Sequence, residues 1–314
     1  MARAITAALP TADRYPDPLC RELRAKLALH EGVPAEQILC GNGAADLIFR
    51  LVWAKKPRRA LVTAPTFAEY ATALESIGCM VKRFFLREQE DFAVTDAFCA
   101  AIRPGVDMVF LCQPNNPTGQ LTALPLVEQI LHRCAACGTL LVVDECFLDF
   151  LPDHALHTAK GLLGEGDLVI LKAFTKLYGM AGVRLGYALS ADTALLEQMQ
   201  ACGQPWGVSS LAQAAGLAAL EETAYVEKVR ALIAEQRPRL TAGLRALGLR
   251  VLDGRANYLL FQAPETLGET LRQRGAVLRS CANYPGLGPG WYRTAVRTGP
   301  ENEQLLKLLA EVLE

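Results

Sequence analysis

The chain has 314 residues, of which 51% are hydrophobic and 21% charged, and its formal net charge is −1. A chain of this length can bury a large core and is expected to form two lobes. The balanced charge argues against a nucleic-acid partner, and the apolar runs are far shorter than the roughly 20 residues of a membrane-spanning helix. This composition is that of a soluble α/β enzyme with a small-molecule substrate.

Cysteine usage and the N-terminus favour a cytoplasmic protein without a metal site. The ten cysteines are scattered, many in apolar contexts such as Cys112 and Cys146, so we expect reduced core residues. Cys134 and Cys137 have the spacing of a zinc site, but no second pair or histidine follows at the required distance. The N-terminal apolar region is too short for a signal peptide, so we expect a cytoplasmic location.

The first part of the chain predicts a helical lead over residues 1–14, followed by the turn Arg14-Tyr-Pro-Asp-Pro18. Asp17 is expected to cap a helix that Pro18 opens and that ends near His30. A short strand from Ile38 then leads through glycines into a helix that begins near Ala44. Free N–H groups at such a helix start can bind an anion, although an ordinary helix entry is the better explanation of the glycines alone.

An alternation of strands and helices predicts an α/β fold, with a mostly parallel sheet flanked by helices on both faces. The predicted elements of this part are strands at 60–64, 79–85, 106–112, 139–144 and 167–172, with helices at 94–102 and 122–137. Two helices follow over 208–246, with a break near Glu221 and a kink at Pro238.

A smaller α+β lobe is predicted to end the chain. Its expected elements are strands at 249–252, 256–262, 276–279 and 291–296, and helices at 264–274 and 300–313. We therefore expect an N-terminal segment over residues 1–39, a large domain over 40–220 and a small domain over 221–314.

Polar side chains end the buried strands of the predicted sheet. Asn116 follows one strand, Asp144 closes the next, and Lys176 and Arg184 follow a third. The carboxyl edge of such a sheet is where α/β enzymes place their ligands. A lysine there can form a Schiff base, and an arginine can bind a phosphate, whereas two solvated cations would explain the same pattern without function.

The motif Asn116-Pro-Thr-Gly119, followed in order by Asp144, Lys176 and Arg184, resembles the fold-type I pyridoxal-phosphate enzymes of the class I/II aminotransferase family. The resemblance runs from about Tyr15 to the C-terminus. It implies pyridoxal 5'-phosphate as cofactor and a homodimer in which Tyr15 contacts the partner's cofactor phosphate. It also implies that Lys176 carries the cofactor and that Asp144 pairs with the ring nitrogen.

Further roles follow from the same resemblance. The phosphate is expected to lie against Gly43, Ala44, Ala45 and Arg184, with Thr175 replacing a hydroxyl that the family commonly carries at the position of Ala173. Phe67 is expected to stack on the ring, and Asn116 to bond its phenolic oxygen, because Phe147 stands where relatives often have tyrosine.

The small lobe is expected to bind the substrate through two arginines. Arg293 and Arg297 are four residues apart on a predicted strand, which places them on one face. In the family, an arginine at the position of Arg293 grips the substrate carboxylate, and Arg297 suits a second anionic group.

Three segments narrow the resemblance to one branch of the family. They are Pro65–Tyr70, Asp144–Phe150 and the ending that contains Asn283-Tyr-Pro-Gly and Arg293-Thr-Ala-Val-Arg-Thr298. Together they are similar to the threonine-phosphate decarboxylases of cobalamin biosynthesis, with histidinol-phosphate aminotransferases as the alternative. A third alternative is a cofactor-binding protein without turnover, because the family carries an Asn-Pro-Leu-Gly segment ahead of Tyr15 that this chain does not contain.

Overall fold

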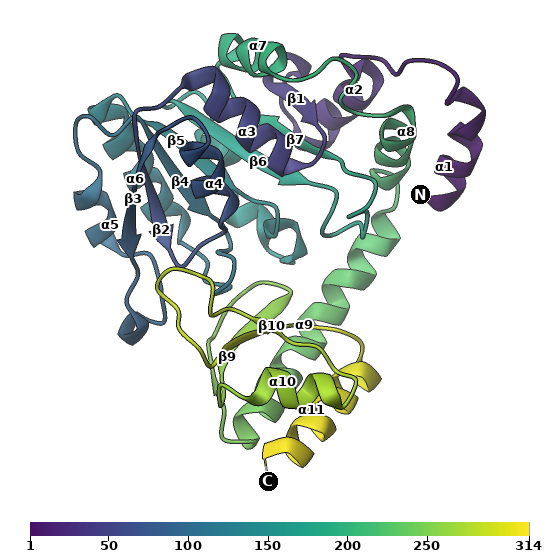
Figure 1. The fold of residues 1–314 in the computed structure, drawn as a ribbon. Coiled ribbons are helices and arrows are strands. Elements are labelled where there is room, and N and C mark those ends of the chain that lie inside the picture. Colours follow the sequence, from purple (N-terminus) through teal and green to yellow (C-terminus); the bar gives the residue numbers. More distant parts are fainter. Residues whose placement is uncertain (314) are drawn as a thin grey trace.

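A computed structural model describes residues 1–313, which form a large upper body and a smaller lower body (Figure 1). The upper body is built on a seven-stranded sheet with the order β1-β7-β6-β5-β4-β2-β3. Its strands are β1 (Ile38–Gly41), β2 (Arg59–Ala64), β3 (Met80–Phe85), β4 (Met108–Cys112), β5 (Leu140–Asp144), β6 (Leu168–Ala173) and β7 (Gly186–Leu189). Strands β2 to β6 run parallel, and β7 is antiparallel to both β6 and β1. The predicted α/β class with a mostly parallel sheet is confirmed.

Both faces of this sheet are covered by helices, so its central strands are buried along their whole length. One face packs against α3 (Ala44–Lys55), α4 (Glu69–Glu75) and α7 (Thr193–Cys202). The other face packs against α2 (Arg21–Glu31), α5 (Asp96–Ala101), α6 (Leu124–Cys137) and α8 (Ser210–Ala219), with α1 (Ala2–Ala8) beside α8. The sheet therefore separates two hydrophobic cores, and neighbouring residues of one strand point into different cores.

The lower body is an antiparallel sheet with the order β10-β11-β9-β8, backed by helices. Its elements are β8 (Arg250–Val251), β9 (Tyr258–Gln262), β10 (Arg279–Ser280), β11 (Trp291–Ala295), α10 (Leu267–Gln273) and α11 (Gly299–Leu313). The long helix α9 (Thr223–Ala246) connects the two bodies and continues through Pro238. The predicted break near Glu221 is confirmed, while the three-domain division remains a prediction.

Some predicted boundaries are wrong. Helix α2 begins at Arg21 rather than Pro18, and Asp17 caps it from one turn away by accepting from the Arg21 amide at 2.7 Å. The strand expected at 276–279 is the short β10, and β7 was not predicted. Strand β7 is only four residues long and follows a glycine-rich loop, so its pattern is too short to read from sequence.

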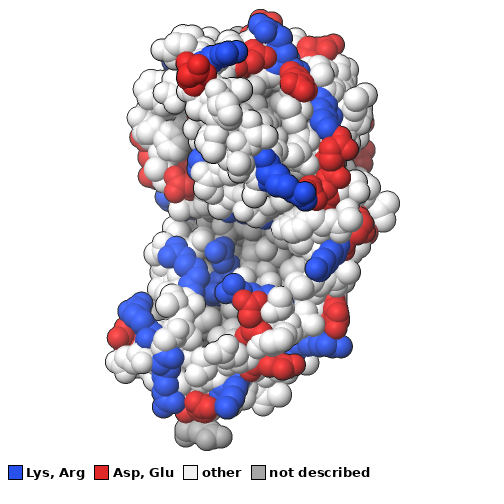
Figure 2. All heavy atoms as spheres, turned by 90° about the vertical axis from the view of Figure 1, so that its right-hand side faces the viewer, with Lys and Arg blue, Asp and Glu red and all other residues white. Residues whose placement is uncertain are grey.

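A backbone hydrogen bond joins the two bodies. The amide of Arg255 donates to the Gly119 carbonyl at 2.7 Å, and a Cβ on Gly254 would lie 2.9 Å from the Gly119 Cα. Beside this contact, Arg255 Nη2 lies 2.8 Å from both carboxylate oxygens of Asp153. Figure 2 shows lysine and arginine side chains around the hollow between the two bodies. No helix within residues 1–313 is long and apolar enough to cross a membrane.

Candidate active site

A cavity of about 140 Å³ lies at the carboxyl ends of β4, β5 and β6. It gathers most of the residues that the sequence analysis singled out in the upper body. Its lining consists of Ala44, Ala45, Phe67, Cys112, Asn116, Asp144, Cys146, Phe147, Ala173, Thr175, Lys176 and Arg184. These residues come from strands and loops far apart in the sequence, and they meet because parallel strands end at one edge. We refer to this space as the cofactor cavity.

One end of the cofactor cavity is suited to an anion. Helix α3 begins there at Ala44, and its N-cap, Gly43, has a φ of +82° and no capping side chain. The guanidinium of Arg184 lies over this helix start and donates to the Asn42 carbonyl at 3.3 Å. A Cβ on Gly43 would lie 2.7 Å from Arg184 Nη2, so the glycine makes room for the arginine. Helix amides and a guanidinium together form a phosphate-binding site.

The opposite end holds the buried carboxylate of Asp144. Its Oδ2 accepts a hydrogen bond from the Tyr70 hydroxyl at 2.6 Å, and its Oδ1 accepts one from the Cys146 amide at 3.0 Å. Burial, and then the charge of Asp144, raise the pKa of Tyr70 well above its usual value, so the hydroxyl remains a donor. Each carboxylate oxygen retains a lone pair that a donor inside the cavity can use.

Lys176 lies at the mouth of the cofactor cavity, three residues after β6 ends. Its side chain is exposed, and its Nζ lies 5.2 Å from the centre of the Phe147 ring. Phe67 lines the cavity and packs edge to face on Tyr70, with ring centres 5.5 Å apart. The amine is therefore accessible and faces the space between Asp144 and Arg184.

Asn116 is held by the lower body as well as the upper. Its Oδ1 accepts hydrogen bonds from Arg293 and, at 3.4 Å, from the Tyr284 hydroxyl. The Tyr258 hydroxyl donates to the neighbouring Asn115 carbonyl at 2.9 Å. The loop that contains Asn116 is thus fixed by side chains of both bodies.

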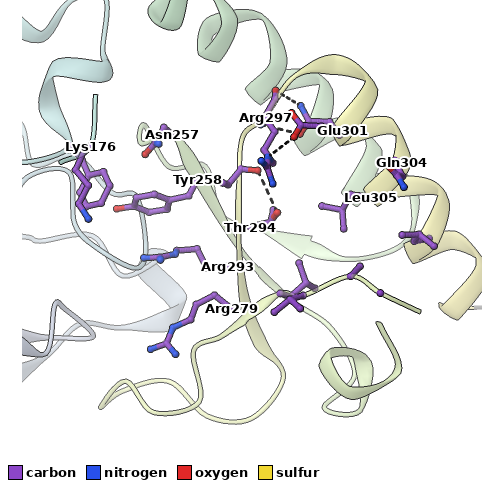
Figure 3. Close-up of a pocket in the computed structure, with 18 residues that line it drawn as sticks. Lys176, Asn257, Tyr258, Arg279, Arg293, Thr294, Arg297, Glu301, Gln304 and Leu305 are labelled. Atoms are coloured by element: carbon purple, nitrogen blue, oxygen red, sulfur yellow. Dashed lines mark hydrogen bonds and ion pairs between the residues drawn. The ribbon is translucent and has the colours of Figure 1, made fainter. Parts of the chain in front are cut away.

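A second cavity of about 600 Å³ opens from Lys176 toward α11 (Figure 3). It shares Phe147 and Lys176 with the cofactor cavity, so the two spaces meet at the lysine. Arg293 and Arg279 line it and are directly opposite each other in the pairing of β10 with β11. Opposed residues of an antiparallel pair share one face, so two positive charges are held side by side here.

One oxygen in the wall of this second cavity lacks a partner. The Oδ1 atom of Asn257 is buried and has no hydrogen-bond partner among residues 1–313. Figure 3 places Asn257 between Lys176 and Tyr258. A buried acceptor of this kind indicates a missing donor, which a bound substrate with an amine or hydroxyl group would supply.

One predicted residue is placed differently from expectation. Strand β11 ends at Ala295, so Arg297 lies beyond it, and the expectation that it shares a strand face with Arg293 is wrong. The side chain of Arg297 pairs instead with Glu301 of α11 at 3.0 Å, although it still lines the second cavity. Tyr15 lies outside both cavities, is 79% exposed and stacks on Trp206 with ring centres 4.5 Å apart.

Sequence reasoning assigned no role to Tyr70, Asn257, Tyr258 or Tyr284. A signal existed for Tyr70, which follows Phe67 by three residues at the start of a helix and therefore lies near it. The other three belong to the lower body, and only the packing of the two bodies brings them to Asn116 and Lys176. No local pattern predicts such contacts.

The residues of the cofactor cavity fit pyridoxal phosphate. The space has donors for an anion at one end, a buried acceptor at the other and an accessible amine at its mouth. A glycine, rather than a larger residue, leaves room for the arginine over the anion site. This distribution matches a flat ring that carries a phosphate, a protonated nitrogen and an aldehyde.

Comparisons with known proteins agree with this geometry. The family model "Aminotransferase class I and II" matches residues 1–312. The threonine-phosphate decarboxylase of Salmonella typhimurium is 40% identical over 99% of this chain and 86% of its own length. The histidinol-phosphate aminotransferase of Symbiobacterium thermophilum is 35% identical over 99% of this chain and 85% of its own length.

Solved structures share the fold. The histidinol-phosphate aminotransferase from Clostridium acetobutylicum has a TM-score of 0.93 at 25% identity, covering 99% of this chain and 94% of that one. The histidinol-phosphate aminotransferase from Sinorhizobium meliloti, solved with pyridoxal-5'-phosphate, has a TM-score of 0.88 at 24% identity, covering 99% and 86%.

Proposed function

The chain belongs to the aminotransferase class I and II family, and from this premise we propose that it is a pyridoxal-phosphate-dependent decarboxylase. Its proposed substrate is L-threonine O-3-phosphate, and its product is (R)-1-amino-2-propanol O-2-phosphate, an intermediate of cobalamin biosynthesis. The observation that carries the proposal is the opposed pair Arg279 and Arg293 in the cavity that opens at Lys176. The relative at 40% identity supports the same activity.

The arginine pair favours a substrate with two anionic groups. Like charges placed directly opposite on a sheet repel each other, and bound anions relieve that repulsion. Threonine phosphate offers a carboxylate and a phosphate a short distance apart. We assign the carboxylate to Arg293, which is nearer to Asn116 and the cofactor cavity, and the phosphate to Arg279, with Arg297 as a further candidate.

The residues of the cofactor cavity would each hold one part of the cofactor. Gly43, Ala44, Ala45, Thr175 and Arg184 would hold the cofactor phosphate, Phe67 would cover the ring, and Asn116 would bond the phenolic oxygen. Asp144 keeps a proton on the ring nitrogen, since a buried carboxylate with free lone pairs favours a protonated partner. Bound pyridoxal phosphate supplies an electron sink for the bond that breaks at Cα.

Lys176 carries the cofactor and then moves a proton. Its amine is exposed between the two cavities, so a substrate amine can displace it. Arg293 holds the departing carboxylate, and Lys176 Nζ delivers a proton to the carbon that lost CO₂. Asn257 Oδ1 accepts a hydrogen bond from the substrate or from the released lysine, which satisfies an otherwise unpartnered oxygen.

A histidinol-phosphate aminotransferase is the second candidate, supported by the relative at 35% identity. Histidinol phosphate has no α-carboxylate, so Arg293 would then hold the substrate phosphate. Lys176 would remove a proton from Cα instead of delivering one after CO₂ leaves. The cofactor cavity serves both reactions equally, and the anionic groups of the substrate distinguish them.

The deciding experiment measures CO₂ release from L-threonine phosphate by the cofactor-loaded protein. We expect release in the wild type, and a loss of about tenfold to a hundredfold in kcat/KM for Arg293→Ala, as for a lost charge-assisted contact. Free threonine should be poorer than threonine phosphate by at least about tenfold for the same reason. Arg297→Ala should reduce that preference only if Arg297 meets the phosphate.

Other outcomes would replace the proposal. If no CO₂ is released and a keto product forms from histidinol phosphate, the second candidate is correct. A protein that binds the cofactor but forms neither product would be a binding protein without turnover.

We also propose a homodimer, located in the cytoplasm, in which Tyr15 reaches the cofactor phosphate of the partner. The exposure of Tyr15, stacked on Trp206 outside both cavities, supports a role at an interface between copies. Light scattering should report a mass of two chains. A monomer with full cofactor occupancy would contradict this part of the proposal.

A further inference from the structure

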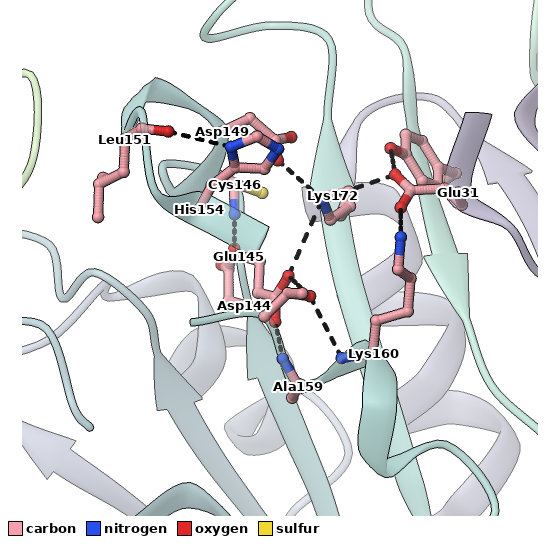
Figure 4. A network of polar contacts seen from close by, with 12 residues as sticks. Glu31, Asp144, Glu145, Cys146, Asp149, Leu151, His154, Ala159, Lys160 and Lys172 are labelled. Carbon is pink, nitrogen blue, oxygen red and sulfur yellow. Dashed lines mark hydrogen bonds and ion pairs between the residues drawn. The ribbon is translucent and has the colours of Figure 1, made fainter. Parts of the chain in front are cut away.

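A buried cluster of charged side chains lies on the other face of β5 and β6, away from the cofactor cavity (Figure 4). Its centre is Lys172, whose Nζ lies 2.8 Å from Asp149 Oδ1, 3.5 Å from Glu31 Oε1 and 3.9 Å from Glu145 Oε2. Lys172 is 4% exposed and Glu145 is fully buried. We call Lys172, Asp149, Glu31 and Glu145 the Lys172 cluster. The proposed reaction uses none of these four side chains.

Hydrogen bonds complete the Lys172 cluster. Glu31 also accepts from the Tyr187 hydroxyl and from Lys160 Nζ, the latter at 3.1 Å. Glu145 accepts from the Thr158 hydroxyl at 2.8 Å and from the Ala159 amide at 2.7 Å. Burial alone would lower the pKa of Lys172, but the charges of Asp149, Glu31 and Glu145 raise it, so the amine remains charged.

Stability does not by itself explain such a cluster. Removing charges from water costs free energy, and replacing a buried ion network by apolar side chains is often neutral or stabilising. A network with directional partners does, however, hold the segments that carry its members in one arrangement. The question is therefore which segments the cluster fixes.

Two members of the cluster lie close in sequence to the proposed catalytic residues. Glu145 follows Asp144, and Lys172 lies four residues before Lys176 at the end of β6. The paired strands bring Asp144 opposite Leu171, so Glu145 and Lys172 meet on one face while Asp144 points to the other. One buried cation thus ties the end of β5 to the end of β6.

The cluster also reaches the helix that connects the two bodies. Asp149, whose side chain holds Lys172, accepts through its carbonyl from Arg230 Nε at 2.9 Å. Arg230 belongs to α9, which leads into the lower body with Arg279 and Arg293. The same lysine is therefore linked to the segment that carries Asp144, to the strand before Lys176 and, through Asp149, to the base of the lower body.

We propose that Lys172 is a positioning residue for the reaction at Lys176: its contacts with Glu31, Glu145 and Asp149 hold Asp144 and Lys176 at the spacing that the cofactor requires. The kinetic test of this inference rests on the proposed function. A second test measures cofactor binding and does not depend on which reaction the protein catalyses. A positioning error of about 1 Å remote from the reacting atoms can lower turnover by roughly a hundredfold.

The test compares Lys172→Met with Lys172→Arg and with Lys160→Met. Lys160 pairs with the same Glu31 but is 30% exposed and does not lie on β6, so it is the matched control. We expect Lys172→Met to lower kcat at saturating cofactor, and to weaken cofactor binding measured by absorbance, by at least about tenfold each. Lys172→Arg should recover most of both losses, and Lys160→Met should keep both within about threefold.

A purely structural role would give a different pattern. Lys172→Met would then lower the melting temperature while kcat and cofactor affinity of the folded fraction stay within about threefold of wild type, and that result would overturn the proposal. If the proposal is correct, the double variant Lys172→Met/Asp149→Asn should regain stability but not turnover, because it also removes the carboxylate that lost its partner.

Two further outcomes each have a defined interpretation. If Lys172→Met and the double variant do not fold, Asp149→Asn takes their place, because it removes one partner and keeps the lysine. Its kcat and its cofactor affinity are then compared with those of the wild type under the same limits. If the wild type releases no CO₂, the proposed function fails, and cofactor affinity alone then decides whether Lys172 positions the cavity.

Discussion

The two faces of β5 and β6 differ in whether their polar groups have partners within the protein. In the Lys172 cluster each buried charge has charged or hydrogen-bonding partners within the protein. In the cofactor cavity the exposed amine of Lys176 and the uncapped start of α3 face open space. Partnered groups hold a geometry, whereas groups left free on a rigid frame are available to a ligand. Variants in the cofactor cavity should therefore remove groups that act on the ligand, whereas variants in the Lys172 cluster should act by displacing those groups.

The largest effect is expected for Lys176→Ala. It removes the nucleophile but little packing, so turnover should fall to below about 1% of wild type while the melting temperature stays unchanged. Turnover is measured as CO₂ release and stability by thermal unfolding. Lys82→Ala on the edge strand β3 removes another exposed lysine and should leave both quantities unaltered. Higher residual turnover would show that Lys176 does not carry the cofactor.

Asp144→Asn should have the next largest effect. The amide keeps the volume and the acceptor for Tyr70 but loses the charge that would hold a proton on the cofactor nitrogen. We expect kcat to fall by roughly 10²–10³-fold, in the range seen when one electrostatic group is removed from an active site. Steady-state kinetics at saturating cofactor measure it. Wild-type kcat would make Asp144 a structural carboxylate.

Gly43→Ala should weaken cofactor binding by about tenfold, because its methyl group would displace the Arg184 guanidinium that lies 2.7 Å from that position. Gly32→Ala is the control, since Gly32 also has a positive φ but has nothing within 4 Å of an added Cβ. Both variants place an L side chain at a positive φ, which strains the backbone. Gly43→Ala alone should change the cofactor dissociation constant, which is measured by absorbance. Equal cofactor dissociation constants for the two variants would show that Arg184 does not bind the cofactor phosphate.

The smallest effect concerns Glu145 and pH. Burial raises the pKa of Glu145 from 4.5 to about 7, although Lys172, Ala159 and Thr158 act to lower it. Between these two values the folded protein binds the proton more tightly than the unfolded chain, so stability falls as the pH rises through this window. Glu145→Gln should remove this loss, which we expect to be roughly 1 to 3 kcal/mol.

Urea unfolding at pH 5 and pH 8 measures the difference between wild type and Glu145→Gln. The exposed Glu22→Gln should leave the pH dependence of the wild type unchanged. Parallel curves for wild type and Glu145→Gln would mean that Glu145 is already ionised at pH 5.

The cofactor cavity could be predicted from sequence because its parts end consecutive strands. Asn116, Asp144 and Lys176 each follow an apolar run, and parallel strands bring such ends together without further information. The phosphate end was predicted only through the family resemblance, because glycines before a helix start are more often an ordinary helix entry. The sequence therefore predicted the family, the sheet and the gathering of these residues, and the structure agrees with all three.

The lower body and the Lys172 cluster could not be predicted in the same way. Lys172 follows the apolar run at Leu168–Leu171, and nothing local shows that it is buried. Its partner Glu31 is 141 residues away in the chain, so only the packed sheet brings the two together. Arg297 was misplaced because the strand ends at Ala295, one residue earlier than predicted, and the side chain beyond it pairs with Glu301.

The contact between Gly119 and Gly254 sets how closely the two bodies approach each other at this point. Gly119 has a φ of +73°, and its Cβ would meet the Gly254 Cα at 3.2 Å, so the absence of two methyl groups lets the bodies approach this closely. For an engineer, this contact is therefore a spacer between the two bodies that can be changed without altering a charged side chain. For evolution, it means that a single added methyl group would act on the spacing of the two bodies and on no charged group.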